Sequence, residues 1–243
     1  AMLRGAPGEV EPTALRRALP DEYLPVSPRQ MRQAWRRLRR MERRGPRTEP
    51  DLDATLAQIA RDGVFLGPAL VARRTNVERL LLLVDRHGSM TPFQVMTRRL
   101  VETARRGGRL AHVGVWYFDN TPFELDAGLA VHSEGAGSEL VLLRDVLSAG
   151  PRAVTGALVV SDAGAARGTY STERIEATRR FLGELRAQLR RVAWINPVPR
   201  HRWPGTSAQA VRAVVPMFEA DRAGLDAALR VLRGRRPHPH GGP

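Results

Sequence analysis

Apolar residues along the chain alternate between short unbroken runs and helix-spaced sets, and this alternation predicts a mixed α/β fold. The unbroken runs are expected as strands, most of them buried on both faces of a sheet; they are Leu80–Val84, Val113–Phe118, Ala157–Val160 and Val192–Ile195. Helices are expected between them, at Thr91–Arg106 and Arg174–Arg190. This order indicates an open, mostly parallel, Rossmann-like sheet with helices on both faces.

The segment before the first of these strands is predicted to be a helical extension. Ser27 and Pro28 suit an N-cap and a first helical position. Four apolar residues follow at helical spacing, namely Met31, Trp35, Leu38 and Met41. Gly45-Pro46 is expected to end this helix, and a second helix is expected at Asp51–Ile59. We therefore expect an extended arm at 1–26, an Arg-rich helical extension at 27–75, the α/β domain at 76–232 and a flexible basic tail at 233–243.

Weaker patterns give the remaining elements. Phe123–Leu125 is expected as the antiparallel return of the strand before it, and Ser138–Leu147 is expected as a helix. Val211–Val215 is ambiguous between helix and strand. Asp221 is expected to cap a final helix that ends at Leu232.

The charge of the chain is strongly basic and unevenly distributed. The formal net charge is +14, and the sequence contains arginine but no lysine. Between Arg29 and Arg47 there are nine arginines and a single acid, Glu42. We expect four of the arginines to face solvent or a partner, namely Arg32, Arg36, Arg39 and Arg43. Such a block can bind nucleic acid, an acidic protein or an anionic surface, and it can equally be a solvated helix face.

Several classes of protein are excluded or disfavoured by the sequence. There is no apolar run long enough for a transmembrane helix and no secretory signal, so we expect a cytoplasmic protein without membrane contact. The absence of cysteine excludes disulfides and cysteine-ligated zinc. No P-loop, dinucleotide fingerprint or Gly-x-Ser-x-Gly nucleophile elbow is found. We therefore do not expect an enzyme; a hydrolase that uses Asp85, His87 and Ser89 is the weaker alternative.

Two acidic residues each follow an unbroken apolar run. Asp85 comes directly after Leu80–Val84, and Ser161-Asp162 comes directly after Ala157–Val160. Parallel strands end at a common edge of the sheet, where ligands bind in folds of this class. Two carboxylates in one crevice repel each other, and a cation between them is a natural resolution.

The residues around these acids resemble the von Willebrand factor A (vWA) family. Its metal-ion-dependent adhesion site has the form Asp-x-Ser-x-Ser, often followed by Met, and here the sequence is Asp85-Arg86-His87-Gly88-Ser89-Met90. The resemblance implies a metal site formed by Asp85, Ser89 and Asp162, with a hydroxyl from a second loop, for which Ser138 is the best match. His87 stands where the first serine belongs. In vWA domains generally, a partner's carboxylate can complete the coordination of the metal.

Other segments resemble one branch of this family. Asp51–Leu56, Gly63 and Arg73-Arg74 are similar to CoxE-like vWA proteins. The segments 161–168 and 194–199 are similar to vWA proteins encoded beside MoxR-type AAA+ ATPases, which are proposed parts of bacterial conflict or quality-control systems. The resemblance implies a protein-interaction module whose partner is such an ATPase or its client.

The substitution at His87 changes what the metal site can hold. Mg²⁺ prefers a near-octahedral shell of oxygen ligands, whereas an imidazole supplies nitrogen and extra volume. We expect a weakened or lost Mg²⁺ site, the alternative being a softer ion such as Mn²⁺, Ni²⁺ or Zn²⁺. The alternative function is a nucleic-acid-associated module that uses the Arg-rich helix and the basic tail.

Overall fold

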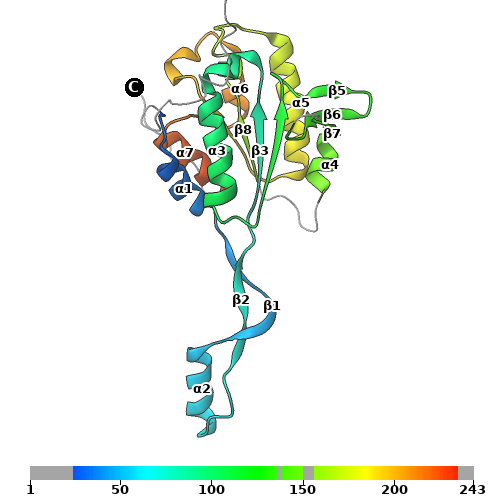
Figure 1. The fold of residues 1–243 in the computed structure, drawn as a ribbon. Coiled ribbons are helices and arrows are strands. Elements are labelled where there is room, and N and C mark those ends of the chain that lie inside the picture. Colours follow the sequence, from blue (N-terminus) through cyan, green and yellow to red (C-terminus); the bar gives the residue numbers. More distant parts are fainter. Residues whose placement is uncertain (1–23, 136–137, 150–155, 235–243) are drawn as a thin grey trace, which may run out of the picture.

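A mostly parallel sheet forms the centre of the computed structural model, which describes residues 24–135, 138–149 and 156–234 (Figure 1). The strand order is β10-β9-β8-β3-β4-β6-β5, with β7 paired to β6. Strands β10, β9, β8, β3 and β4 run parallel, and β5, β6 and β7 form antiparallel pairs at one side. Their bounds are β3 Arg79–Asp85, β4 His112–Phe118, β5 Phe123–Leu125, β6 Gly128–His132, β7 Leu140–Leu142, β8 Gly156–Val160, β9 Val192–Asn196 and β10 Met217–Glu219. The expected fold class is confirmed.

Helices cover both faces of this sheet. Their bounds are α1 Pro28–Arg36, α3 Gln94–Gly107, α4 Leu143–Ser148, α5 Thr172–Gln188, α6 Ser207–Val214 and α7 Arg222–Leu232, with short 3-10 helices η3 at Gly88–Phe93 and η4 at Arg200–Arg202. Helices α1, α3 and α7 pack on one face, and α4, α5 and α6 pack on the other. Within the described residues, no helix combines the length and the hydrophobicity that a membrane span requires.

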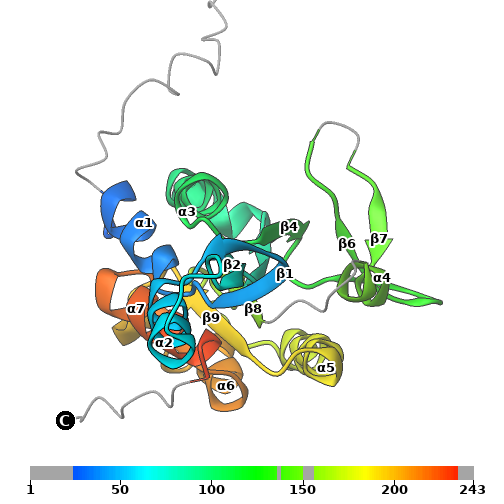
Figure 2. The ribbon, with the colours of Figure 1, turned by 90° about the horizontal axis from the view of Figure 1, so that it is seen from below.

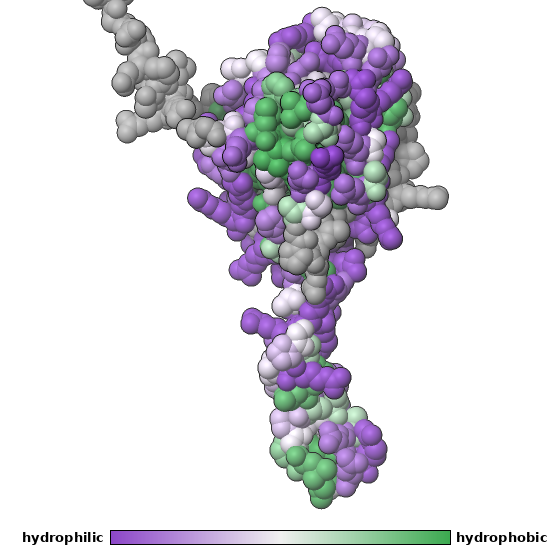
Figure 3. All heavy atoms as spheres, turned by 90° about the vertical axis from the view of Figure 1, so that its right-hand side faces the viewer, coloured by the Kyte–Doolittle hydropathy of each residue, from purple (hydrophilic) through white to green (hydrophobic). Residues whose placement is uncertain are grey.

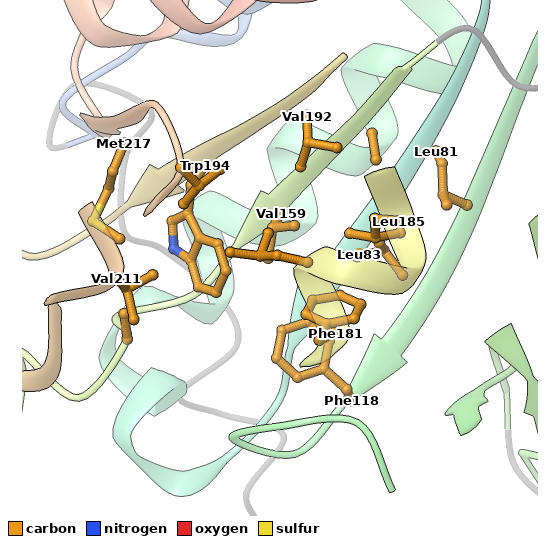
Figure 4. Packing of buried hydrophobic residues seen from close by; sticks show 14 of the residues in the cluster. Leu81, Leu83, Phe118, Val159, Phe181, Leu185, Val192, Trp194, Val211 and Met217 are labelled. Carbon is orange, nitrogen blue, oxygen red and sulfur yellow. The ribbon is translucent and has the colours of Figure 1, made fainter. Parts of the chain in front are cut away.

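Two aliphatic clusters form the core, one on each face of the sheet. Successive side chains of a strand point to opposite faces, so Leu81 and Leu83 of β3 join the cluster beneath α5, while Leu82 joins the cluster beneath α1 and α3. Figure 4 shows the first cluster, in which Phe181 of α5 lies beside Phe118 of β4. These strands are buried on both faces, which explains why their sequences are continuously apolar.

Helix α1 is part of the α/β domain. Ser27 caps it through a reciprocal pair of hydrogen bonds with Gln30. Met31, Trp35 and Leu38 are buried against α3 and α7, as the spacing predicts. The Trp35 indole Nε1 donates a hydrogen bond of 3.0 Å to the Thr103 hydroxyl of α3.

The predicted helix up to Gly45 is wrong beyond Arg36. The chain turns there and continues as β1, Met41–Pro50, which pairs antiparallel with β2, Leu70–Asn76. The register of the pair shifts near Gly45, which has a φ of 94°. Gly45-Pro46 therefore lies within an irregular strand of an exposed two-stranded ribbon, where proline is tolerated.

The ribbon and the helix at its end form a stalk, defined here as residues 41–76. Helix α2, Leu52–Asp62, lies at the end of the stalk; Asp51 caps it and Gly63 ends it in the left-handed region. This helix agrees with the predicted one. The stalk leaves the sheet next to the beginning of β3, at the edge opposite to Asp85 (Figure 1). Figure 2 looks along the stalk from its α2 end.

Apolar side chains are exposed at the end of the stalk, and Figure 3 shows them as a hydrophobic patch. Seven of the twelve exposed large apolar side chains of the described residues lie on the stalk. We call five of them the stalk tip: Leu52, Leu56, Val64, Phe65 and Leu66, with exposed fractions of 55–75%. Contiguous apolar surface of this kind marks an interaction site or an aggregation risk.

Some of the weaker predictions need correction. Ser138–Leu147 is not a single helix, because it contains β7 followed by α4. Phe123–Leu125 is a strand, but it pairs with β6, which the sequence did not predict, rather than with β4. Val211–Val215 belongs largely to helix α6, and β10 follows it. The final helix begins at its Asp221 cap as predicted. The expected extended arm and basic tail lie almost wholly outside the described residues.

Candidate functional site

Asp85 and Asp162 lie at the same edge of the sheet, at the ends of neighbouring strands. Asp85 is the last residue of β3, and Asp162 follows β8 by two positions. The strands pair in parallel with Val84 opposite Val160, so the two chain segments leave the sheet side by side. Both carboxylates are almost completely buried, with exposed fractions of 2% and 1%.

The Asp85 carboxylate accepts three hydrogen bonds from the protein, and both of its oxygens take part. Its Oδ1 accepts from the backbone N–H of His87 and of Asn120, each at 2.9 Å, and its Oδ2 accepts from the Ser161 hydroxyl at 2.7 Å. Burial raises the pKa of this carboxyl, the hydrogen bonds oppose that rise, and the nearby charge of Asp162 adds to it. Asp85 therefore joins three loops even without a cation.

Asp162 is held in the same way. Its Oδ1 accepts from the Ser89 hydroxyl at 3.1 Å, and its Oδ2 accepts from the backbone N–H of Ala166 at 3.0 Å. Its main-chain carbonyl accepts from the Asn196 side chain at 2.9 Å. The hydroxyl of Ser89 thus reaches the second acid rather than Asp85, which ties the η3 loop to the loop after β8.

A tight turn follows Asp162. Ala163 and Gly164 have φ values of 49° and 85°, and the left-handed region favours glycine. A Cβ on Gly164 would clash with Nη1 of Arg174, so a larger residue here would displace this guanidinium group. The Nε of Arg174 donates to the Asn120 side-chain oxygen at 2.7 Å. Arg174 therefore braces the loop after β8 against the loop after β4.

His87 lies beside a cation of the protein. The guanidinium Nη2 of Arg167 is 3.1 Å from Nδ1 and 3.4 Å from Nε2 of the imidazole. Arg167 is exposed and His87 is partly buried. A guanidinium group thus occupies the solvent side of the position where the metal-site pattern has a serine.

Ser138 is not brought to this site by any described contact. It precedes β7 on the hairpin of β6 and β7, which extends away from the body of the domain (Figure 2). Its hydroxyl lies 3.5 Å from Nδ1 of His132, at the end of β6. The hydrogen bonds given to Asp85, Ser89 and Asp162 in the described structure do not include Ser138.

These side chains fit a divalent cation poorly in this arrangement. Mg²⁺ needs about six oxygen ligands in near-octahedral geometry. Of the five side chains that the metal-site pattern assigns, Asp85 and Asp162 already accept hydrogen bonds on both oxygens, Ser138 bonds elsewhere, and His87 offers nitrogen next to Arg167. Among the described residues, no group of three or more His, Cys, Asp or Glu side chains is arranged to hold a metal ion.

The four arginines proposed as a basic surface do not share one helix face. Arg32 and Arg36 are exposed on α1, Arg39 follows the end of α1 and is half-buried, and Arg43 is exposed on β1. Several neighbouring arginines of the same block are paired with acids: Arg37 with Asp226, and both Arg40 and Arg44 with Glu42. Arg43 also lies 3.8 Å from Asp51. The block is therefore spread over two elements and partly neutralised.

Four residues of the site were not among those predicted from sequence, namely Asn120, Ser161, Arg167 and Arg174. Ser161 directly precedes Asp162, and its place at a strand end is a usable signal. Asn120 comes directly after Asp119 in the turn that ends β4, where asparagine accepts a positive φ, here 66°. The two arginines have no such signal, because only the folding of the loop and of α5 brings Arg167 to His87 and Arg174 to Asn120.

Comparison with known proteins supports the resemblance to the vWA family over part of the chain. Residues 24–134 match the family model described as "VWA domain containing CoxE-like protein". No curated protein and no solved structure matches the chain significantly. The matched range begins just before α1 and ends after β6, so it includes the stalk and the Asp85 loop, while Asp162 lies beyond it.

Proposed function

We propose that the chain, whose residues 24–134 match the model of the CoxE-like vWA family, acts as a non-enzymatic protein-interaction module. We further propose that its partner is a MoxR-type AAA+ ATPase or a client of one, in a bacterial conflict or quality-control system. vWA domains generally mediate protein interactions, and the family match supports that class of role. The particular partner is our inference from the resemblance of segments 161–168 and 194–199 to vWA proteins encoded beside such ATPases.

The observation that carries the proposal is the stalk tip. Leu52 and Leu56 lie one helical turn apart on α2, and the exposed segment Val64–Leu66 follows the helix. Anchors at this spacing are typical of a helix that docks into an apolar groove of another protein. Three acids, Asp51, Asp53 and Asp62, flank the tip against the single base Arg61, which disfavours an anionic membrane as the contact. The stalk tip therefore suits docking into an apolar groove of a partner protein.

The position of the stalk supports a bridging role. The stalk tip lies beyond the amino edge of the sheet (Figure 1). Asp85 and Asp162 lie at the carboxyl edge, where Arg167 contacts His87. One partner held at the tip leaves the other edge of the sheet free for a second contact. We propose that the ATPase engages the tip, and that the loop around His87 and Arg167 serves as a metal-free recognition surface.

We expect Phe65→Glu to weaken binding of the MoxR-type ATPase by about thirtyfold or more, because a charge replaces an apolar anchor at the centre of the contact. Phe65 is 62% exposed, so the variant should keep the melting temperature of the wild type. Binding of the purified ATPase from the same genome would be measured by biolayer interferometry. The matched control is Phe123→Glu, because Phe123 is exposed on β5 away from the stalk.

Two results would contradict this proposal. Equal loss of affinity in Phe65→Glu and Phe123→Glu would remove the stalk tip from the contact. Failure of the wild type to bind any MoxR-type ATPase of its genome would remove the partner. Binding of DNA or RNA that weakens steeply with salt would instead favour the nucleic-acid alternative.

We also propose that the metal site is degenerate, and we expect His87→Ser to improve Mg²⁺ binding. Serine returns a neutral oxygen donor and removes the ring that Arg167 contacts. At 100 times the dissociation constant, a cation that binds only the folded state adds about 2.7 kcal/mol, which is a rise of about 5–10 °C in melting temperature for a chain of this size. The measurement is a thermal shift with Mg²⁺, Mn²⁺, Ni²⁺, Zn²⁺ or chelator, with the exposed His201→Ser as the control.

The outcomes of the thermal shift separate the alternatives. Clear stabilisation of the wild type by Mg²⁺ would refute the degenerate site. Stabilisation by Mn²⁺, Ni²⁺ or Zn²⁺ alone would mean that His87 has changed the metal preference. No shift in either protein would mean that the hydroxyl assigned to Ser138 is missing from the site as well.

A further inference from the structure

A cavity of about 450 Å³ lies between α3 and the ends of β3 and β4. The cavity results from the order in which the strands are connected. Strand β4 leads into the antiparallel strands β5 and β6 instead of a crossover helix, so no helix of the described residues lies next to α3 on the β4 side of that face. A volume of this size is typical of pockets that hold small organic ligands.

The cavity carries more positive charge than its own acids neutralise. Four arginines line it, namely Arg86, Arg98, Arg105 and Arg106. Arg105 pairs with Glu134 at 2.5 Å, and Glu134 also accepts from the Tyr117 hydroxyl at 3.2 Å. Glu102 pairs with Arg99, outside the cavity lining. The third acid of the lining, Asp85, is engaged by the three hydrogen bonds described above.

Of the four arginines, only Arg105 has an ion pair with an acid in the described part of the chain, and Arg86, Arg98 and Arg106 have none. Arg98 lies on the exposed side of α3 and makes no ion pair there. The Arg86 guanidinium lies 4.6 Å above the centre of the Tyr117 ring, a cation–π contact that leaves its N–H donors available. Both guanidinium groups have the forked donors that suit a carboxylate or a phosphate.

The inner wall of the cavity is apolar. Val84 of β3 and Val101 of α3 are buried, and both line the cavity. An ion without an apolar part would leave this wall in contact with water, whereas a ligand with an aromatic or aliphatic body would cover it. We propose that the cavity binds a small organic anion, with a phosphate or carboxylate held by Arg98 and Arg86 and an apolar body against Val84 and Val101.

The test uses phenyl phosphate and benzoate as probes, with inorganic phosphate and uncharged benzyl alcohol for comparison. Binding is followed by ¹H–¹⁵N correlation spectra of the full chain. Both aromatic anions should shift the amide signals of Val84, Arg98 and Val101. Inorganic phosphate should bind more weakly than phenyl phosphate, and benzyl alcohol should produce no saturable shift.

The variant Arg98→Gln should weaken phenyl phosphate binding about tenfold or more, because a hydrogen bond to a charged group is lost. Its matched control is Arg179→Gln, which removes the same charge from the exposed side of α5 on the other face of the sheet. That variant should bind within twofold of the wild type. Both positions are exposed, so neither substitution should disturb folding.

Three outcomes would overturn the proposal. The first is an equal loss of binding in both variants, which would indicate only the general field of a basic protein. The second is saturable binding of benzyl alcohol as strong as that of benzoate. The third is binding of an acidic peptide through Arg98 while neither aromatic anion binds, which would make the cavity part of a protein interface.

Discussion

Replacing Trp35 by alanine is expected to lower the free energy of unfolding by about 3–5 kcal/mol, the range for removal of a large buried aromatic side chain. Trp35 is completely buried between α1, α3 and the sheet, and its indole bonds to Thr103. The loss would be measured by urea denaturation followed by circular dichroism. Trp35→Phe should lose less, because the ring still fills most of the space and only the hydrogen bond disappears.

The control for this prediction is Leu56→Ala. Leu56 is also an apolar residue of the N-terminal region, but it is 63% exposed at the stalk tip, so its replacement should change the unfolding free energy by less than about 0.5 kcal/mol. If Trp35→Ala unfolded at the same urea concentration as the wild type, α1 would be an appendage and not part of the core.

Asp85→Ala is expected to destabilise the protein by about 2–4 kcal/mol in the presence of chelator. The substitution leaves three donors without their acceptor, namely the Ser161 hydroxyl and the backbone N–H groups of His87 and Asn120. Each unsatisfied buried donor costs about 1–3 kcal/mol, partly offset by relaxation and by entering water. Thermal and urea unfolding in EDTA would measure the loss independently of any metal.

Two further variants frame this result. Asp85→Asn keeps the size of the side chain and one acceptor oxygen. Its free energy of unfolding should therefore lie between that of the wild type and that of Asp85→Ala. Asp119→Ala removes an acid from the exposed loop after β4 and should be nearly neutral. An Asp85→Ala protein as stable as the wild type in EDTA would show that the hydrogen bonds contribute little, and that the acid is retained for a ligand.

The central sheet could be predicted from the sequence because its strands are buried on both faces. Leu80–Val84, Ala157–Val160 and Val192–Ile195 have no polar interruption, and runs of this length are typical of strands that are covered on both faces. The meeting of Asp85 and Asp162 followed from the same pattern, since parallel strands end at one edge. Strands β6, β7 and β10 were missed; all three lie towards the sides of the sheet, and β7 and β10 have only three residues each.

The stalk ribbon could not be predicted, because both of its faces are largely exposed and no apolar alternation marks it. Its charges give the physical reason for a strand. In a helix, Arg36, Arg40 and Arg44 would repel at spacings of four residues. In a strand, Arg40, Glu42 and Arg44 share one face, and Glu42 pairs with both arginines at 2.6 and 2.5 Å.

Only those residues of the site that lie at or just after strand ends could be predicted from the sequence. Asp85 ends strand β3, and Ser89 and Asp162 follow strands β3 and β8 within a few residues, so their positions follow from the order of elements. Arg167 and Arg174 reach the site through the conformation of the loop after β8, where Ala163 and Gly164 adopt positive φ. The spacing of residues in the sequence does not predict the backbone conformation of such a turn. The pairing of His87 with Arg167 was therefore beyond sequence reasoning, although His87 itself was not.

All four tryptophans and all three tyrosines lie outside residues 41–76, and this placement separates the stalk from the rest of the molecule spectroscopically. Strands β1 and β2 are joined mainly to each other, and the base of the ribbon is closed by the bond from the Val77 N–H to the Arg40 carbonyl. The stalk can therefore open locally while the sheet remains folded. Intrinsic fluorescence would record no change in that event, whereas amide hydrogen exchange would show the stalk as a separate, faster-exchanging unit.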